Sequence, residues 1–176
     1  MRGAAVKSQA YRYGACALLT ALGVIVVAHG FELFGGYTPC PLCLQQRWAY
    51  YLGIPATFLA LILLTGGRTA WAVWAFFLVS LVYLANAGLG TYHAGAEWKY
   101  WPGPETCSTS AAISPNAGGL LKQLETTRVS RCDEAPWRFL GLSFAGWNVL
   151  VSFLLWITLS QAAFSAAAQP KQKLSI

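Results

Sequence analysis

Two cysteines and an arginine form the stretch with the clearest chemical potential, "CPLCLQQR" at residues 40–47. A C-x-x-C pair occurs in zinc sites, in structural disulfides and in redox centres that exchange thiols and disulfides. Arg47 lies four residues after Cys43, which is about one turn further on if a helix has begun by then. A cation at that position would favour a thiolate or another anion nearby. The stretch is therefore the first candidate for a reactive site.

A stabilising disulfide is a plausible role for the pair Cys107 and Cys132 but a poor one for the pair Cys40 and Cys43. A disulfide between Cys107 and Cys132 would close a loop of about 25 residues and could contribute roughly 3 kcal/mol in the chain-entropy model. A bond between Cys40 and Cys43 would close a very small ring and remove little loop entropy, so a redox role explains that pair better. Cys16 lies in an apolar segment, where a lone cysteine usually serves as a small hydrophobic residue.

A structural zinc site has little support, because such sites commonly combine two C-x-x-C pairs or one pair with two histidines. Cys107 and Cys132 are far apart in sequence, and the two histidines are His29, expected near the end of an apolar segment, and His93. The sequence also has no C-x-x-C-H, no G-x-G-x-x-G and no tight group of four cysteines. We therefore expect no metal, haem, flavin or iron–sulfur cluster.

A largely apolar chain must position these residues. Its 176 residues are 56% hydrophobic and 10% charged, against about 25% charged in a soluble domain. A membrane helix needs about 20 mostly apolar residues, and four segments qualify: 14–34, 48–64, 70–90 and 144–167. The first is longer than the apolar core of a signal peptide and lacks a clear cleavage site. We expect an all-α integral membrane four-helix bundle forming a single domain over residues 1–176.

The basic residues orient these segments, because they favour the cytoplasmic side of a membrane. The two terminal tails and the turn between the second and third segments carry basic residues and no acidic ones: Arg2, Lys7, Arg12, Arg68, Lys171 and Lys173. Both termini are then cytoplasmic, and two loops, residues 35–47 and 91–143, lie outside. Each outer loop holds two cysteines, in a compartment where disulfides persist. The basic residues form no dense patch, so we expect no nucleic-acid partner.

The residues alone therefore indicate an outward-facing redox pair at the mouth of a helical bundle, with a second cysteine pair in the longer loop. Such a loop can meet a soluble thiol protein, and a pair at the membrane surface can meet a lipid-soluble electron carrier such as a quinone. The outer aromatic residues, Trp137 among them, are expected to form an interfacial belt rather than a quinone cage, although one or two could do both.

Three stretches together resemble the family of the disulfide bond formation protein DsbB: "CPLCLQQR", "YHAGAEWKYWPGPETC" and "RCDEAPWRFLGLSFAGWN". The resemblance covers the chain from about residue 14 to the end of the fourth apolar segment. It implies a multi-pass protein of the bacterial inner membrane that reoxidises a soluble periplasmic oxidase of the DsbA type and passes the electrons to ubiquinone or menaquinone. The route from DsbA through DsbB to quinone is already known to keep the bacterial periplasm oxidising.

The resemblance also implies roles for the four outer cysteines. The pair Cys107–Cys132 would accept electrons from the DsbA-type partner, with Cys107 forming the mixed disulfide. Cys132 would then exchange with Cys40, and Cys43 would face the quinone as a charge-transfer thiolate. Each exchange needs an attacking thiolate and a good leaving thiolate.

Two further residues match positions at the family's quinone site. Arg47 would lie against the quinone ring, although an ordinary interfacial anchor would use the same residue. His93 matches the family's histidine less closely, because its spacing to the following cysteine varies, and it fits an interfacial histidine equally well. Glu97, four residues later, is expected nearby but is given no catalytic role. Residues 120–125 suit a short amphipathic helix, either on the membrane surface or packed on the bundle.

Other functions remain open at this point. A specialised relative that serves one dedicated client oxidase would share the mechanism and differ only in its partner. A non-catalytic membrane scaffold with structural disulfides would not need Cys40 or Cys43 for disulfide formation. A quinone or vitamin K-epoxide type of reductase shares the helical bundle and the C-x-x-C motif, but there the motif usually comes late in the chain.

Overall fold

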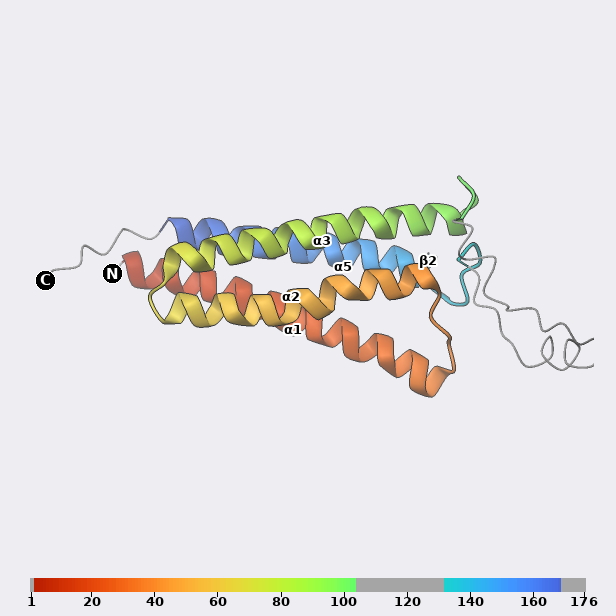
Figure 1. The fold of residues 1–176 in the computed structure, drawn as a ribbon, viewed down its shortest axis with the longest axis horizontal. Coiled ribbons are helices and arrows are strands. Elements are labelled where there is room, and N and C mark those ends of the chain that lie inside the picture. The colour runs from red at the N-terminus through yellow and green to blue at the C-terminus, as the bar shows by residue number, and fades with distance from the viewer. Residues whose placement is uncertain (1, 104–131, 169–176) are drawn as a thin grey trace, which may run out of the picture.

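Four long helices make up most of the computed structural model, which describes residues 2–103 and 132–168, with side chains from residue 8 onward (Figure 1). The helices are α1 (Arg2–Gly35), α2 (Pro41–Thr65), α3 (Thr69–Glu97) and α5 (Phe144–Ala167). Two short antiparallel strands, β1 (Arg138–Phe139) and β2 (Leu142–Ser143), precede α5. All four helices are long and apolar enough to cross a membrane, so the predicted helical membrane bundle is confirmed. The predicted amphipathic helix lies outside the described residues.

The helices extend beyond the apolar segments that predicted them. α2 begins at Pro41 and α3 ends at Glu97, so both run further than the predicted spans 48–64 and 70–90. Cys40 caps the start of α2, and a proline in the first turn is preorganised for a helix. In α3 the buried positions continue at helical spacing to the last residue, although several of them are polar. Part of each predicted outer loop is therefore helical.

The packing of the helices leaves one of them partly detached. α3 contacts both α2 and α5, and these contacts bury Phe76, Tyr83 and Leu155. An interhelical hydrogen bond in this region joins Asn86 Nδ2 to Ser152 Oγ at 2.9 Å. α1 is the least buried of the four helices, and its second half leans away from the others in Figure 1. Residues of this half of α1, from Thr20 to Glu32, line a cavity that α2 and α5 also line.

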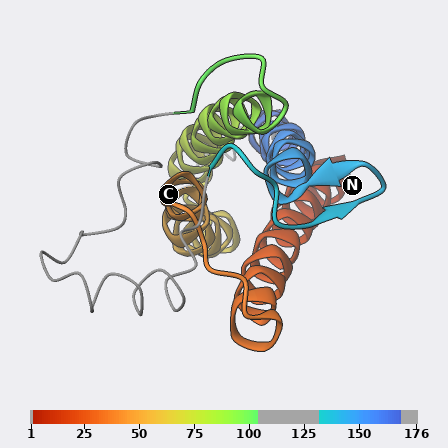
Figure 2. The ribbon, with the colours of Figure 1, turned by 90° about the vertical axis from the view of Figure 1, so that its right-hand side faces the viewer.

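The connections at that end bring distant segments together. α1 and α3 end there, and α2 and α5 begin there. Seen from this end (Figure 2), the segment that precedes β1 crosses the bundle and leads into the β1–β2 hairpin beside α5 and α1. Residues near positions 40, 93 and 140 therefore meet at one end of the molecule.

We expect Gly53→Ala to destabilise the bundle. A Cβ on Gly53 would lie 2.5 Å from the Tyr83 hydroxyl oxygen and 2.8 Å from its ring carbon Cζ, so α2 and α3 would have to separate. Overpacking of this kind costs about 1–3 kcal/mol. The measurement is the free energy of unfolding in mixed detergent micelles. Gly88→Ala is the matched control, because its Cβ meets nothing within 4 Å. An equal loss in both variants would contradict this account of α2–α3 packing.

Candidate redox-active site

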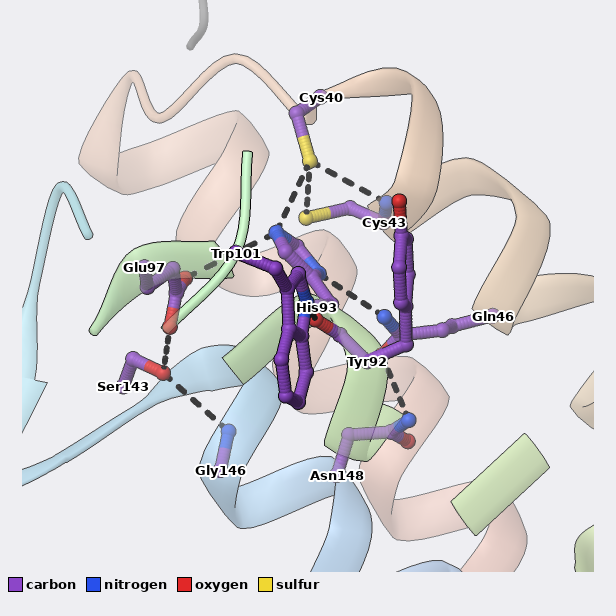
Figure 3. A network of polar contacts seen from close by, with 10 residues as sticks. All are labelled: Cys40, Cys43, Gln46, Tyr92, His93, Glu97, Trp101, Ser143, Gly146 and Asn148. Atoms are coloured by element: carbon purple, nitrogen blue, oxygen red, sulfur yellow. Dashed lines mark hydrogen bonds and ion pairs between the residues drawn. The ribbon is translucent and has the colours of Figure 1, made fainter. Parts of the chain in front are cut away.

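The C-x-x-C pair lies at the start of α2, and its two sulfurs are in contact without a covalent bond (Figure 3). Cys40 Sγ lies 2.9 Å from Cys43 Sγ. Cys40 is also the N-cap of α2, and its sulfur accepts the backbone N–H of Cys43 at 3.2 Å. The N-terminus of a helix favours a negative charge, because its first N–H groups have no partner within the helix. The structure therefore holds the reduced pair with Cys40 in the position that best accepts a charge.

These contacts lower the pKa of Cys40 to about 5. The largest cause is the hydrogen bond from the Cys43 side chain, which stabilises the thiolate. Burial opposes the shift, and His93 assists it through a hydrogen bond and its charge. Cys40 is thus the sulfur on which the reduced pair carries its first negative charge.

A third cysteine lies against this pair. Cys132 is disulfide-bonded and buried, and it packs in one cluster with Cys40 and Leu42, which Cys43 also contacts. Cys107, its predicted partner, lies outside the described residues, so the Cys107–Cys132 pairing stays a prediction. The exchange predicted between Cys132 and Cys40 needs the two residues to be neighbours, and this packing makes them so.

His93 connects the sulfur pair to a buried chain of polar groups. Its Nε2 lies 3.6 Å from Cys40 Sγ, and its Nδ1 lies 2.9 Å from Gln46 Nε2. The amide oxygen of Gln46 accepts a hydrogen bond from Asn148 at 2.6 Å, and Tyr50 donates to Asn148 at 2.7 Å. The imidazole is therefore fixed from both sides. Its assignment as a quinone-binding residue stays a prediction.

Glu97 lies close to His93, as its position four residues later predicted. Its carboxylate lies 3.7 Å from His93 Nε2 and accepts a hydrogen bond from the hydroxyl of Ser143, the N-cap of α5. The spacing of four residues from His93 on one helix was the signal, because residues i and i+4 lie on the same face. Gln46 and Asn148 were missed, since an amide in an apolar segment does not reveal its partner.

Arg47 points into an apolar cavity of about 590 Å³ beside α1. Cys40, Cys43 and His93 also line this cavity. The guanidinium Nη1 of Arg47 donates to Glu32 Oε2 at 2.7 Å, and the arginine side chain is 14% exposed. A partly buried ion pair of this kind favours one orientation of the guanidinium. Arg47 is thus part of the cavity wall, whereas a residue that only anchored α2 at the membrane surface would be more exposed.

Aromatic rings cover the outer side of the cavity. Trp137 stacks on Phe144 with ring centres 4.8 Å apart, and Phe31 of α1 lies 5.0 Å from Phe144 and 5.2 Å from Trp137. Trp137 lines the cavity, so it is one of the outer aromatic residues for which both roles stay open. Aromatic faces of this kind accept a flat ring by stacking. The size and lining fall within the usual range for a small-molecule site.

Metal binding is a weaker interpretation of the same cluster. Among the described residues, Cys40, Cys43 and His93 place three potential ligand atoms within 4.8 Å of one another. Two thiolates on a tetrahedral zinc ion, each about 2.3 Å from it, would be roughly 3.8 Å apart. The two sulfurs are 2.9 Å apart, which suits a shared proton or a disulfide about to form. Cys16 lies on an exposed face of α1 and is not part of the site.

Comparison with known proteins agrees with the family resemblance of the sequence motifs. The family model described as disulfide bond formation protein DsbB matches residues 11–162. A disulfide bond formation protein B of Acidovorax sp. strain JS42 is 31% identical over 154 residues, which cover 81% of this chain and 82% of that protein. One from Paracidovorax citrulli is 30% identical over 172 residues, with 86% and 92% covered. No solved structure gives a significant match.

The rate at which Cys40 is alkylated in the reduced protein should rise with pH and reach half of its plateau value near pH 5. Only the thiolate reacts, and the contacts described above lower the pKa of Cys40 to about 5. Iodoacetamide labelling followed by mass spectrometry of the Cys40 peptide measures the midpoint. Cys43→Ala removes the main hydrogen-bond donor and should move the midpoint upward, and Cys43→Ser, which keeps a hydroxyl donor, should move it less. A wild-type midpoint near 8.5, the ordinary value for cysteine, would contradict the assignment.

Proposed function

The chain belongs to the DsbB family of disulfide bond formation proteins, and from this premise we propose that it oxidises a soluble DsbA-type thiol oxidase and passes the electrons to a membrane quinone. The observation that carries the proposal is the contact between three elements: the Cys40–Cys43 pair, the buried Cys132, and the apolar cavity. A non-catalytic scaffold does not explain why an unbonded C-x-x-C pair lines such a cavity.

Disulfide exchange within the chain follows from the positions of the sulfurs. The dithiol of the partner is oxidised to a disulfide, and the Cys107–Cys132 disulfide is reduced. The Cys132 thiolate attacks Cys40 of an oxidised Cys40–Cys43 pair, so a Cys132–Cys40 bond forms and Cys43 leaves as a thiolate. The packing of Cys132 against Cys40 supports this step. Cys43 then holds the electron pair on the wall of the cavity.

The cavity suits a quinone in both shape and chemistry. The stacked rings of Trp137 and Phe144 would hold a flat head group, and Arg47 would favour negative charge on it. Along α1 the lining continues to Thr20, Gly23 and Val24, which gives an apolar path for an isoprenoid chain. A bound quinone supplies a two-electron acceptor that leaves as the quinol. Either ubiquinone or menaquinone fits this description.

The orientation follows from charge. The chain is a multi-pass membrane protein, and we place it in the bacterial inner membrane with both termini in the cytoplasm. The start of α1 and the end of α5 lie at the same end of the bundle, opposite the cysteine site. Basic residues without acidic neighbours occur at that end, as is typical of cytoplasmic segments. The redox cysteines then face the periplasm, where the partner oxidase is found.

Purified protein should reduce a short-chain quinone when a reduced DsbA-type partner is added, and quinone absorbance follows the reaction. Cys43→Ala should abolish turnover, because the electron pair then has no sulfur on the cavity wall. Cys16→Ala is the matched control and should retain wild-type turnover, since Cys16 lies on an exposed face of α1 away from the site. No turnover by the wild type, with a quinone known to be competent, would remove the proposed function.

A further inference from the structure

Lys99 occupies a backbone position after α3 that is usually glycine. The helix ends at Glu97, the N–H of Lys99 then donates to the carbonyl of Ala96 at 3.1 Å, and the N–H of Tyr100 donates to the carbonyl of Gly95 at 3.0 Å. These two bonds form a Schellman motif, in which the residue at the position of Lys99 is left-handed and most often glycine. Lys99 adopts this conformation, with φ 63°, at a steric cost that glycine does not have. The end of the helix therefore does not explain the choice of lysine.

The helix dipole does not explain the charge of Lys99 either. A cation in the last turn of a helix is favourable, but the last turn of α3 contains no basic residue. A lysine in that turn would meet the dipole in an ordinary helical conformation. At its own position Lys99 makes an ion pair, because its Nζ donates to Asp133 Oδ2 at 2.9 Å. The charge thus serves a contact with a distant part of the chain.

An aromatic contact fixes the turn that carries Lys99 to α3. The indole N–H of Trp101 donates to the backbone carbonyl of Tyr92 at 2.9 Å, and the two rings stack with centres 6.0 Å apart (Figure 3). Gly95 makes room for the indole, because a Cβ there would overlap the ring. Lys99 lies between the Schellman bonds and this contact, so the turn presents its side chain from a fixed place.

The partner of Lys99 is next to a cysteine of the site. Asp133 directly follows Cys132, which is 1% exposed and packs against Cys40. The segment continues across the end of the bundle (Figure 2) to Trp137, whose ring stacks on α5. Residues 132–137, which we call the strap, are therefore held at both ends, by the ion pair beside the cysteine and by the aromatic contact at the other end.

The exposure of the ion pair indicates what it can influence. The side chain of Lys99 is 61% exposed and that of Asp133 is 30% exposed. Exposed ion pairs contribute little to the stability of a fold, so the bundle does not depend on this one. A contact beside a reactive cysteine can still change the effective concentration of its sulfur at a target, because a small free energy changes a ratio of populations severalfold.

We propose that Lys99 is a positioning residue for disulfide exchange, whose ammonium group holds Asp133, and with it Cys132, against Cys40. The inference rests on the proposed function, in which the Cys132 thiolate attacks Cys40. In that step a bond forms between the sulfurs of Cys132 and Cys40, the Cys40–Cys43 bond breaks, and its electron pair leaves on Cys43. Lys99 transfers neither electrons nor protons. It raises the fraction of molecules in which the strap keeps Cys132 within reach.

The test measures how readily Cys132 and Cys40 join in a two-cysteine protein, in which Cys16, Cys43 and Cys107 are replaced by alanine. Oxidised glutathione takes up the two electrons and two protons that the thiols lose, and becomes two molecules of reduced glutathione. The glutathione ratio at which half of the protein is joined gives the effective concentration of one sulfur at the other. The joined and unjoined forms are separated by mass spectrometry after alkylation.

Lys99→Gly should have opposite consequences for exchange and for folding. The effective concentration should fall about threefold, because the ammonium group is lost. The free energy of unfolding in mixed detergent micelles should not fall, because glycine adopts the left-handed conformation without the steric cost. A residue that only stabilised the end of α3 would lower both quantities together. In 1 M salt the difference in effective concentration should shrink, since exposed charges are screened.

Charge reversal tests the contact itself. Lys99→Asp should lower the effective concentration further than Lys99→Gly, because two carboxylates then face each other. Adding Asp133→Lys to Lys99→Asp should restore most of the value of the two-cysteine protein, and Lys99→Arg should retain it. Arg68→Gln is the matched control, since it removes a positive charge at the opposite end of α3 and should have no effect.

An unchanged effective concentration in Lys99→Gly would overturn the proposal. A charge reversal that Asp133→Lys does not rescue, or a loss that is equally large in 1 M salt, would overturn it as well. The assay contains neither quinone nor partner oxidase, so it stands apart from the turnover assay. If Cys132 and Cys40 do not join even with Lys99 in place, the exchange step of the proposed function is wrong and this proposal fails with it.

Discussion

The start of α2 at Pro41 is the constraint on which the site depends. It makes Cys40 the N-cap residue, so that its sulfur receives the N–H of Cys43 and the favourable end of the helix dipole. One turn of helix then brings Cys43 beneath Cys40 and points Arg47 into the cavity. A start several residues later would leave the C-x-x-C pair in a flexible loop. The hydrogen bond from the Cys43 side chain, which is the largest cause of the low pKa of Cys40, is thus made possible by where the helix begins.

The cavity depends on a second feature, the divergence of α1 from the other helices. α1 supplies one wall, the ends of α2 and α3 supply the sulfurs and the imidazole, and the segment around Trp137 closes the outer side. The lining of this space is mostly apolar, which strengthens the interactions of charged groups within it. A reactive sulfur, a hydrophobic electron acceptor and a charged arginine can meet in such a place, although the surrounding bundle is almost entirely apolar.

The sequence predicted the architecture well because each part has a local signal. Four apolar segments predicted four helices, and the C-x-x-C motif with Arg47 predicted the centre of the site. The predicted start of α2 was too late and the predicted end of α3 was too early, because the mean hydropathy falls at polar residues that are still helical. At α2 the helix begins at Pro41, with Cys40 as its N-cap. The contact of Glu97 with His93 had a local signal in their spacing of four residues. The contact of Gln46 with His93 and that of Glu32 with Arg47 depend on how the helices pack, and no pattern within one segment reveals them.

The contact between Cys132 and Cys40 is the point at which the whole account can be tested most directly. The variant with Cys43→Ala and Cys107→Ala leaves these two cysteines and Cys16. Under mild oxidation, followed by digestion and mass spectrometry, the account predicts a disulfide between the Cys40 and Cys132 peptides. Recovery of both as unlinked thiols, under conditions in which a small disulfide reagent modifies them, would contradict it. The sulfurs would then be too far apart to pass electrons within one chain.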